Sequence, residues 1–392
     1  MKKIGILTFV FNNYGTILQT YALCQILKSL LDEQSYSVEV VNMNMEWSKR
    51  LSNRGGERIK NLVGAYGLGA WKPLYEKIKW HFDYKKLNKQ DRSAEIAKRD
   101  SLFDGLKSKI PYTSPISCEN IRKGALDSYD ILISGSDQVW NIDYTESLDI
   151  YFQAVLSESS KRNIKKLSYA ASFGFRKIPS GYESEYADLI KNMDSILVRE
   201  EDAVGVSKIL GRSDAKCVLD PTLLLNADKW SELIPNEKII EDEYVLVYSL
   251  NSSYRIYEEA AKLAKKHGLK KICLKRSFCP PCLDDSWMDL YSVSPEHFLQ
   301  LIKNAKYVVT NSFHALVFSI TFGTDFFAFL EKTDTVNSRL ESILRMLKLE
   351  SRIVYEGAHL NLNAGSVDFS WANKKLEEKR KESCRLLVES II

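Results

Sequence analysis

The sequence predicts an α/β protein with two Rossmann-like domains, each built around a mainly parallel sheet. Short apolar segments alternate with helically spaced apolar segments along most of the chain. A polar, acidic stretch at 235–243 divides this alternation into two series. The chain has 392 residues, more than one hydrophobic core normally supports, so we expect two domains.

The N-terminal domain, expected at 1–235, begins with a strand, a turn and a helix. The strand is the apolar run that starts at Ile4, and turn residues follow it at 12–15. Helically spaced apolar residues then continue to Leu31, and a strand at 38–41 completes a βαβ unit. Further strands are expected at 129–134, 166–172, 195–198 and 217–219. These four strands end in polar or glycine-containing loops, and ligands bind at such carboxyl ends of parallel sheets.

The C-terminal domain, expected at 244–365, repeats the alternation. Strands are expected at 244–249, 271–274, 307–310 and 325–330, and helices at 255–267, 294–305, 313–322 and 337–349. Ser294 and Pro295 are typical of a helix start, since they supply an N-cap and a proline in the first turn. An amphipathic helix at 371–392 ends the chain, and we expect it to pack back on the N-terminal domain.

Composition excludes several classes of protein. Apolar residues make up 45% of the chain and charged residues 27%, which excludes disordered and fibrous proteins. The net charge of +4 does not call for nucleic acid. A basic, helical insertion is expected at about 46–110, because residues 54–109 hold fourteen Lys and Arg against seven Asp and Glu. With its interleaved aromatics it could bind an anionic membrane or a phosphorylated substrate, or simply form a solvated helical face.

Cysteine usage and hydropathy predict a cytoplasmic protein. The seven cysteines are scattered, which does not suit a secreted disulfide framework. The one close pair, Cys279 and Cys282, encloses two prolines and has no further zinc ligands at suitable spacing. No apolar run is long enough to span a bilayer. We therefore expect no metal and no membrane span.

Known nucleotide and protease motifs are absent. The chain has no Walker loop, Gly-x-Gly-x-x-Gly fingerprint, His-Glu-x-x-His motif or Gly-x-Ser-x-Gly elbow. These absences argue against P-loop kinases, nucleotide-dependent dehydrogenases, zinc peptidases and typical esterases. The chemistry must then come from the polar loops at the strand ends.

Three residues at strand ends are the best catalytic candidates. His314 falls in the first turn of an expected helix, where it could bind an anion or transfer a proton, or merely cap and pack. Arg199 follows a strand and could hold a carboxylate or phosphate, or pair with a neighbouring glutamate. Asp137 follows another strand and could act as a base or hold sugar hydroxyls.

Other polar residues at strand ends are expected to bind substrate. In the N-terminal half they are Asn13, Tyr14, Gly15, Gln19, Ser136 and Gln138. In the C-terminal half they are Lys275, Arg276, Asn311 and Ser312. The two cations among them suit an anionic ligand.

Six motifs in order resemble the polysaccharide pyruvyl transferase family. They are Asn-Tyr-Gly-Thr-Ile-Leu-Gln at 13–19, Gly-Ser-Asp-Gln-Val-Trp-Asn at 135–141, Ser-Tyr-Ala-Ala-Ser-Phe-Gly at 168–174, Val-Arg-Glu at 198–200, Val-Leu-Asp-Pro-Thr-Leu-Leu at 218–224 and Asn-Ser-Phe-His-Ala at 311–315. The resemblance covers about residues 3–330. Two positions depart from it: Asn311 stands where the family often has Asp, and Ala315 where it often has Gly.

The resemblance implies a GT-B-like arrangement of the two domains around a cleft, with the acceptor on the N-terminal domain and the donor on the C-terminal one. It implies transfer of the enolpyruvyl group of phosphoenolpyruvate to a sugar, forming a pyruvate ketal and releasing phosphate. His314 would then transfer a proton and contact phosphate, and Arg199 would hold the anionic groups. The acceptor would be a saccharide carried on a lipid diphosphate, used at the inner face of the membrane for a capsule or exopolysaccharide. No cofactor is implied.

Two other functions stay open at this point. One is a GT-B glycosyltransferase that uses a nucleotide sugar. The other is a saccharide- or anion-binding module without turnover.

Overall fold

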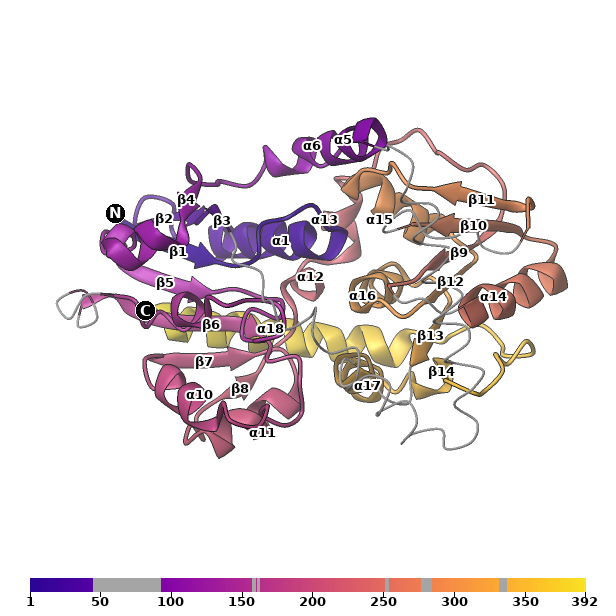
Figure 1. Ribbon diagram of the computed structural model, residues 1–392. Coiled ribbons are helices and arrows are strands. Elements are labelled where there is room, and N and C mark those ends of the chain that lie inside the picture. The colour runs from indigo at the N-terminus through magenta and orange to yellow at the C-terminus, as the bar shows by residue number, and fades with distance from the viewer. Residues whose placement is uncertain (45–92, 157–159, 161–162, 251–253, 276–283, 331–336) are drawn as a thin grey trace. The chain divides into compact units, whose positions relative to one another are not determined.

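The structure is a computed structural model that describes residues 1–44, 93–156, 160, 163–250, 254–275, 284–330 and 337–392. The chain divides into two compact units, which are described separately (Figure 1). In its described residues the first unit comprises 1–44, the described part of 106–225, and 374–392. The second comprises 93–105 and the described part of 226–373.

The first unit is built on a six-stranded parallel sheet of order β2-β1-β5-β6-β7-β8. Its strands are β1 (Lys2–Leu7), β2 (Tyr36–Val40), β5 (Ile131–Ser134), β6 (Lys165–Ala171), β7 (Ser195–Val198) and β8 (Lys216–Cys217). A separate parallel pair consists of β3 (Met43–Asn44) and β4 (Ile116–Ser117). The helices are α1 (Tyr14–Leu30), α7 (Cys118–Asn120), the π-helical turn η2 (Ile121–Ala125), α8 (Leu148–Tyr151), α10 (Glu183–Ile190), α11 (Glu201–Ile209) and α12 (Pro221–Leu224).

The second unit has a six-stranded parallel sheet of order β11-β10-β9-β12-β13-β14. Its strands are β9 (Tyr244–Tyr248), β10 (Lys270–Leu274), β11 (Trp287–Leu290), β12 (Tyr307–Thr310), β13 (Phe326–Leu330) and β14 (Ile353–Tyr355). Its helices are α5 (Ser93–Ser101), α13 (Ala227–Ser231), α14 (Tyr254–His267), α15 (Pro295–Asn304), α16 (Phe313–Phe322), α17 (Asn337–Met346) and the 3₁₀ turn η3 (Glu350–Arg352). The short helix α6 (Asp104–Lys107) passes from this unit to the first.

These sheets confirm the predicted fold class, two Rossmann-like domains with parallel strands. In chain order, the first sheet reads 2-1-3-4-5-6 and the second reads 3-2-1-4-5-6. In each sheet the order reverses beside the first strand, between β1 and β5 and between β9 and β12. Such reversals separate the loops at the carboxyl ends of the two strands and create the usual ligand position of open α/β sheets.

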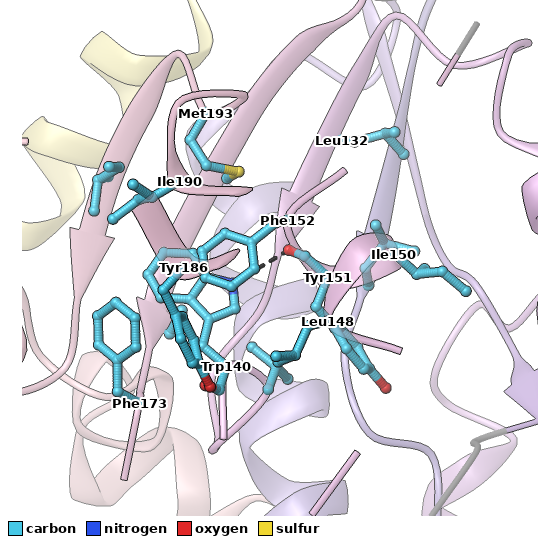
Figure 2. Close-up of a cluster of buried hydrophobic side chains, with 14 of the residues drawn as sticks. Leu132, Trp140, Leu148, Ile150, Tyr151, Phe152, Phe173, Tyr186, Ile190 and Met193 are labelled. Atoms are coloured by element: carbon cyan, nitrogen blue, oxygen red, sulfur yellow. Dashed lines mark hydrogen bonds between the residues drawn. The ribbon is translucent and has the colours of Figure 1, made fainter. Parts of the chain in front are cut away.

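An aromatic cluster forms much of the core beneath the loop that follows β5 (Figure 2). The rings of Trp140 and Phe152 are stacked with their centroids 4.5 Å apart. Trp140 Nε1 donates to the carbonyl of Tyr151 at 3.2 Å, and the Tyr186 hydroxyl donates to the carbonyl of Trp140 at 2.8 Å. Each aromatic pair adds about 0.5–1.5 kcal/mol beyond its buried area, so the cluster fixes where this loop leaves the sheet.

The domain boundary lies earlier than the polar stretch at 235–243 suggests. The second unit already begins at Asn226, and the ring of Trp230 packs edge-on against Phe318, 5.0 Å away. The side chain of Gln300 donates to the carbonyls of Pro235 and Glu237. The stretch expected to link the domains is therefore held on α15 of the second unit.

The predicted insertion at 46–110 and the predicted C-terminal helix have different outcomes. Most of the expected insertion at 46–110 lies outside the described residues, but its described part at 93–105 groups with the second unit, not the first. There the guanidinium of Arg99 lies 5.2 Å from the ring centre of Tyr291. The last helix, α18 (Ser370–Ile391; yellow in Figure 1), contributes 374–392 to the first unit. Ser383 Oγ accepts from the amide of Leu219 at 3.0 Å there.

Candidate functional site

The first polar cluster lies at the reversal between β1 and β5. Asn13 caps α1, because its Oδ1 accepts from the amides of Gly15 at 2.9 Å and Thr16 at 3.4 Å. Thr16 Oγ1 in turn donates to Asp137 Oδ2 at 3.2 Å, which links α1 to the loop after β5. Thr8 Oγ1 donates to the carbonyl of Ser136 at 2.9 Å and ties the same two loops together. The topology thus brings together residues that are more than 120 positions apart in the chain.

Asp137 sits in a constrained turn. Its φ is +85°, a region that residues other than glycine rarely occupy and that normally costs free energy. Its Oδ1 accepts from the amide of Gln138 at 2.9 Å, and its carbonyl accepts from the amide of Ser172 at 3.0 Å. The side chain is 16% exposed, so the carboxylate is still reachable from solvent. Such strain is common at functional positions, where surrounding contacts over-determine the backbone.

Arg199 occupies a very different environment from an anion-binding arginine at a surface. Its side chain is only 1% exposed and lies among three carboxylates. Its NH1 donates to Asp220 Oδ2 at 3.0 Å, its NH2 lies 3.9 Å from Asp137 Oδ1, and its Nε lies 3.7 Å from Glu200 Oε2. Burial alone would lower the pKa of Arg199, but the three carboxylates raise it above the ordinary value.

Asp220 is a residue that the sequence interpretation missed as a site residue. It is completely buried, and its Oδ2 accepts from both Arg199 and Ser136 Oγ, the latter at 2.9 Å. Its Oδ1 accepts from the amide and hydroxyl of Thr222. The sequence signals were its place in the motif at 218–224 and in the Asp-Pro turn after β8, where it is the N-cap of α12.

Three predicted substrate-binding side chains of this domain serve the fold. Tyr14 and Gln19 have no exposed surface, and Gln19 Nε2 donates to Thr8 Oγ1 at 3.1 Å. Gln138 Oε1 accepts from Asn141 Nδ2 at 2.8 Å, in the loop above the aromatic cluster. These contacts hold the two loops in place.

The second polar cluster lies at the reversal between β9 and β12. Asn311 Oδ1 accepts from the amide of Leu250 at 2.7 Å, and its Nδ2 donates to Ser249 Oγ at 3.2 Å. Thr310 Oγ1 donates to the carbonyl of Tyr248 at 2.6 Å. An aspartate at 311 would lack the Nδ2 donor, so the departure from the family pattern changes how the ends of β9 and β12 are joined.

His314 is the second residue of α16, a ten-residue helix. Ser312 caps the helix, since its Oγ accepts from the amide of Ala315 at 3.4 Å. The His314 ring is half-buried and meets the ring of Phe313 edge-on, 5.4 Å away. Helix N-termini attract anions through their amide groups and dipole, so the imidazole stands where a phosphate or carboxylate is favoured.

The second domain holds one predicted cation in an ion pair and adds a buried arginine that was not predicted. The ammonium of Lys275 pairs with Asp289 on the neighbouring strand β11, and Arg276 lies outside the described residues. Arg339, on α17, is buried, and its guanidinium lies 5.9 Å from the ring centre of Phe313. No sequence motif singled out Arg339, because an arginine in an amphipathic helix is normally exposed to solvent. Only the packing of α17 on α16 brings this charge near the helix start.

Metal and membrane features were sought in the same part of the chain. Among the described residues, no group of three or more His, Cys, Asp or Glu is arranged to hold a metal ion. None of the described helices combines the length and the apolar character needed to cross a bilayer. Cys279 and Cys282 lie outside the described residues.

Comparison with known proteins identifies the family. The profile of the family described as "Polysaccharide pyruvyl transferase" matches residues 13–332, most of the chain. The chain belongs to the polysaccharide pyruvyl transferase family. The match spans both switch-point clusters and includes Asp137, Arg199 and His314. A transferase of polysaccharide biosynthesis is thereby supported, and no curated protein matches the chain.

Solved structures similar to this pyruvyl transferase family member show the same fold. UDP-GlcNAc 2-epimerase from Methanocaldococcus jannaschii has a TM-score of 0.54 and 12% identity, over 99% of both chains. MnaA of S. aureus, solved with UDP, has a TM-score of 0.52 and 9% identity, over 98% of this chain and 91% of that one. At such identities the likeness shows the fold alone, and it agrees with the predicted GT-B-like pair of Rossmann-like domains.

Proposed function

We propose that this transferase moves the enolpyruvyl group of phosphoenolpyruvate onto two hydroxyls of a sugar, forming a cyclic pyruvate ketal and releasing phosphate. The observation that carries the proposal is His314 in the first turn of α16, at the order reversal of the second sheet. An acid is needed there because the methylene carbon of the donor must become a methyl group. Membership of the family supports the transfer of a pyruvyl group.

The proposed reaction balances without an external oxidant or cofactor. A proton adds to the methylene carbon, and a sugar hydroxyl attacks the carbon that bears the phosphate, losing its own proton. The carbon–oxygen bond to phosphate then breaks, and the second hydroxyl adds to the same carbon and loses its proton. Of the two protons lost, one replaces the proton delivered to carbon and the other leaves with hydrogen phosphate.

The donor carries about three negative charges near neutral pH, so its site must supply positive charge and amide donors. The N-terminus of α16 supplies amides, and Ser312 adds a hydroxyl at the cap. We assign His314 to proton transfer and phosphate contact. Asn311 shapes the same strand end through Ser249 and Leu250.

The acceptor hydroxyls require a base that remains reachable from solvent. Asp137 meets this requirement, since its carboxylate is partly exposed and its turn is held by Thr16. We assign Asp137 to accept a proton from the sugar, with Asn13 and Gly15 at the start of α1, directly before the Thr16 that donates to Asp137. A saccharide linked to a lipid diphosphate at the inner face of the membrane is the acceptor that we propose, which makes the enzyme cytoplasmic and peripheral.

Turnover tests the proposal directly. The purified protein is incubated with phosphoenolpyruvate and a lipid-diphosphate oligosaccharide, and phosphate release and the mass of the ketal are followed. His314→Gln should lower kcat by about 10²–10⁴-fold, because general acid–base catalysis contributes that much. His267→Gln is the matched control: His267 ends α14, is exposed and touches the ring of Tyr307. Full activity of the His314 variant would refute the assignment.

A thermal-shift comparison separates the proposal from a glycosyltransferase. One similar structure, MnaA of S. aureus, was solved with UDP, so a nucleoside diphosphate is the appropriate ligand to compare with phosphoenolpyruvate. Ligands that bind only the folded state raise Tm. We expect stabilisation by phosphoenolpyruvate and none by UDP, and the reverse result would favour a nucleotide-sugar donor.

A further inference from the structure

The first domain contains a buried cluster with an excess of negative charge. It holds one guanidinium, that of Arg199, and three carboxylates, those of Asp137, Glu200 and Asp220. If all are ionised, the formal sum is −2. The side chains of Arg199, Glu200 and Asp220 are no more than 5% exposed, whereas that of Asp137 is 16% exposed. A buried charge requires close partners, so these groups have to be considered as one unit.

The guanidinium is a poor site for a trianionic donor. Each of the three carboxylates lies within 4.0 Å of one of its nitrogens, and burial excludes a further ligand from solvent. A phosphate or carboxylate placed beside it would meet an environment that is already negative. The charge that Arg199 provides is therefore used within the protein.

The contacts of the cluster converge on the Asp137 turn. Asp220 Oδ2 accepts from Arg199 at 3.0 Å and from Ser136 Oγ at 2.9 Å, and Asp220 is anchored through its other oxygen by Thr222. Thr8, in the loop after β1, donates a hydrogen bond to the carbonyl of Ser136. Ser136 is thus fixed on two sides directly before Asp137, whose backbone has the unusual positive φ. A strained turn persists only when such neighbouring contacts over-determine it.

We infer that Arg199 is a positioning residue: together with Asp220 it holds the Ser136–Asp137 turn, which carries the base for the acceptor sugar. This inference rests on the proposed function, because it assumes that Asp137 is the acceptor base. It changes the expected role of Arg199 from contact with the donor to support of the base.

The other groups that face Asp137 are consistent with this role. Thr16 donates to it from α1. Glu200 belongs to the same cluster, and its Oε1 accepts from Ser172 Oγ at 2.6 Å. Tyr151, on α8, is fully buried, and burial together with the nearby Cys118 and Asp137 holds the pKa of its hydroxyl well above the usual value. Tyr151 therefore stays neutral, and the guanidinium of Arg199 lies 3.9 Å from Asp137 Oδ1.

The split between kcat and KM distinguishes support of the base from donor binding. Arg199→Gln removes the guanidinium that donates to Asp220 at 3.0 Å, and so loosens the turn that carries Asp137. We expect kcat to fall by up to about 10²-fold, because a misplacement of a reacting group by about 1 Å costs that much. The KM for phosphoenolpyruvate should stay unchanged, whereas the loss of a donor contact would raise it.

Two further variants serve as controls. Arg199→Lys retains the charge but loses the branched geometry, so it should recover kcat only in part and leave KM unchanged. Arg122→Gln removes an exposed arginine of the same domain that pairs with Asp149 through two nitrogens, and it should change neither kcat nor KM. A raised KM for phosphoenolpyruvate with an unchanged kcat in Arg199→Gln would show that Arg199 holds the donor and would overturn the inference.

A second measurement does not depend on turnover. Arg199→Gln, Asp137→Asn and the double variant are unfolded thermally, and the losses in Tm are compared. Coupled residues give non-additive losses, and independent residues give additive ones. We expect the double variant to lose less than the sum. Additive losses would refute the coupling even if the enzyme forms ketals, whereas failure of the wild type to release phosphate would refute only the proposed function. If Arg199→Gln does not fold, Arg199→Lys still tests whether kcat or KM changes.

Discussion

Replacing Gly174 by alanine tests how tightly the loops of the first domain are packed. Gly174 follows β6 with φ +70°, a left-handed conformation that costs other residues about 1–2 kcal/mol. A Cβ at this position would lie 2.8 Å from Gln138 Cδ and closer still to its Oε1 and to Asn141 Nδ2. Gln138 would have to move, and its hydrogen bond to Asn141 would break.

The expected loss of stability in Gly174→Ala has two parts, the cost of the backbone conformation and the cost of the broken hydrogen bond. A lost hydrogen bond that leaves a buried polar group unsatisfied costs about 1–3 kcal/mol. Added to the backbone term, this predicts that Gly174→Ala lowers the free energy of unfolding by about 2–5 kcal/mol. Gly181 is the matched control, because its φ is +87° but a Cβ there would meet nothing within 4 Å. Gly181→Ala should therefore lower the free energy of unfolding only by the backbone cost, about 1–2 kcal/mol.

Calorimetry of both variants gives the answer. One kcal/mol shifts Tm by about 2–4 °C in a domain of 150–250 residues, so Gly174→Ala should melt roughly 2–12 °C below Gly181→Ala. Phosphate release from phosphoenolpyruvate should also fall in the first variant, because Gln138 directly follows Asp137. Equal losses of Tm in the two variants would refute the argument from close packing.

Two further predictions concern a helix cap and a surface carboxylate. Ser312→Ala removes the cap of α16 and should lower the free energy of unfolding by about 1 kcal/mol, and Ser294→Ala should do the same at α15. Only Ser312→Ala should lower kcat, because it loosens the helix that carries His314. Equal kcat values in the two variants would contradict this. Glu39 is partly buried, which opposes its charge, but hydrogen bonds from Lys3 and from a tyrosine lower its pKa on balance. Its contribution to stability is then complete above its ordinary pKa of 4.5 and disappears as pH falls through the lowered value. Glu39→Gln should therefore reduce Tm at pH 7, and the reduction should shrink as pH falls below 4.5, as thermal melts across this range would show. A reduction of the same size at every pH would contradict this.

The strands and helices that the sequence predicts are those with strong periodicity. The ten expected strands correspond to observed ones, and α16 and α15 begin at the residues that their caps indicate. The strands that were missed are the short pair β3 and β4 and the two edges of the second sheet, β11 and β14. β11 exposes Met288 and contains Asp289, so it lacks the continuous apolar pattern of a buried strand.

The candidate site was predictable where chemistry and strand ends coincide. His314, Ser312 and Asn311 directly follow the buried strand β12, and in a parallel sheet that edge is the expected place for ligands. The same rule placed Arg199 at a strand end, but it did not predict which residues surround the guanidinium. The sequence offers Glu200 as the adjacent partner, yet the closest contact comes from Asp220, on a loop that follows another strand.

The sequence by itself determined which segments become strands and helices, and that polar residues follow the strands. It did so because hydrophobic periodicity and caps act over a few residues. Only the tertiary structure decided that the guanidinium of Arg199 is buried among three carboxylates, that Asp220 anchors the Asp137 turn, and that Arg339 lies against Phe313. Those environments arise from strand order and helix packing between segments far apart in the chain, and the charge and burial of a group depend on all the neighbours that these bring together.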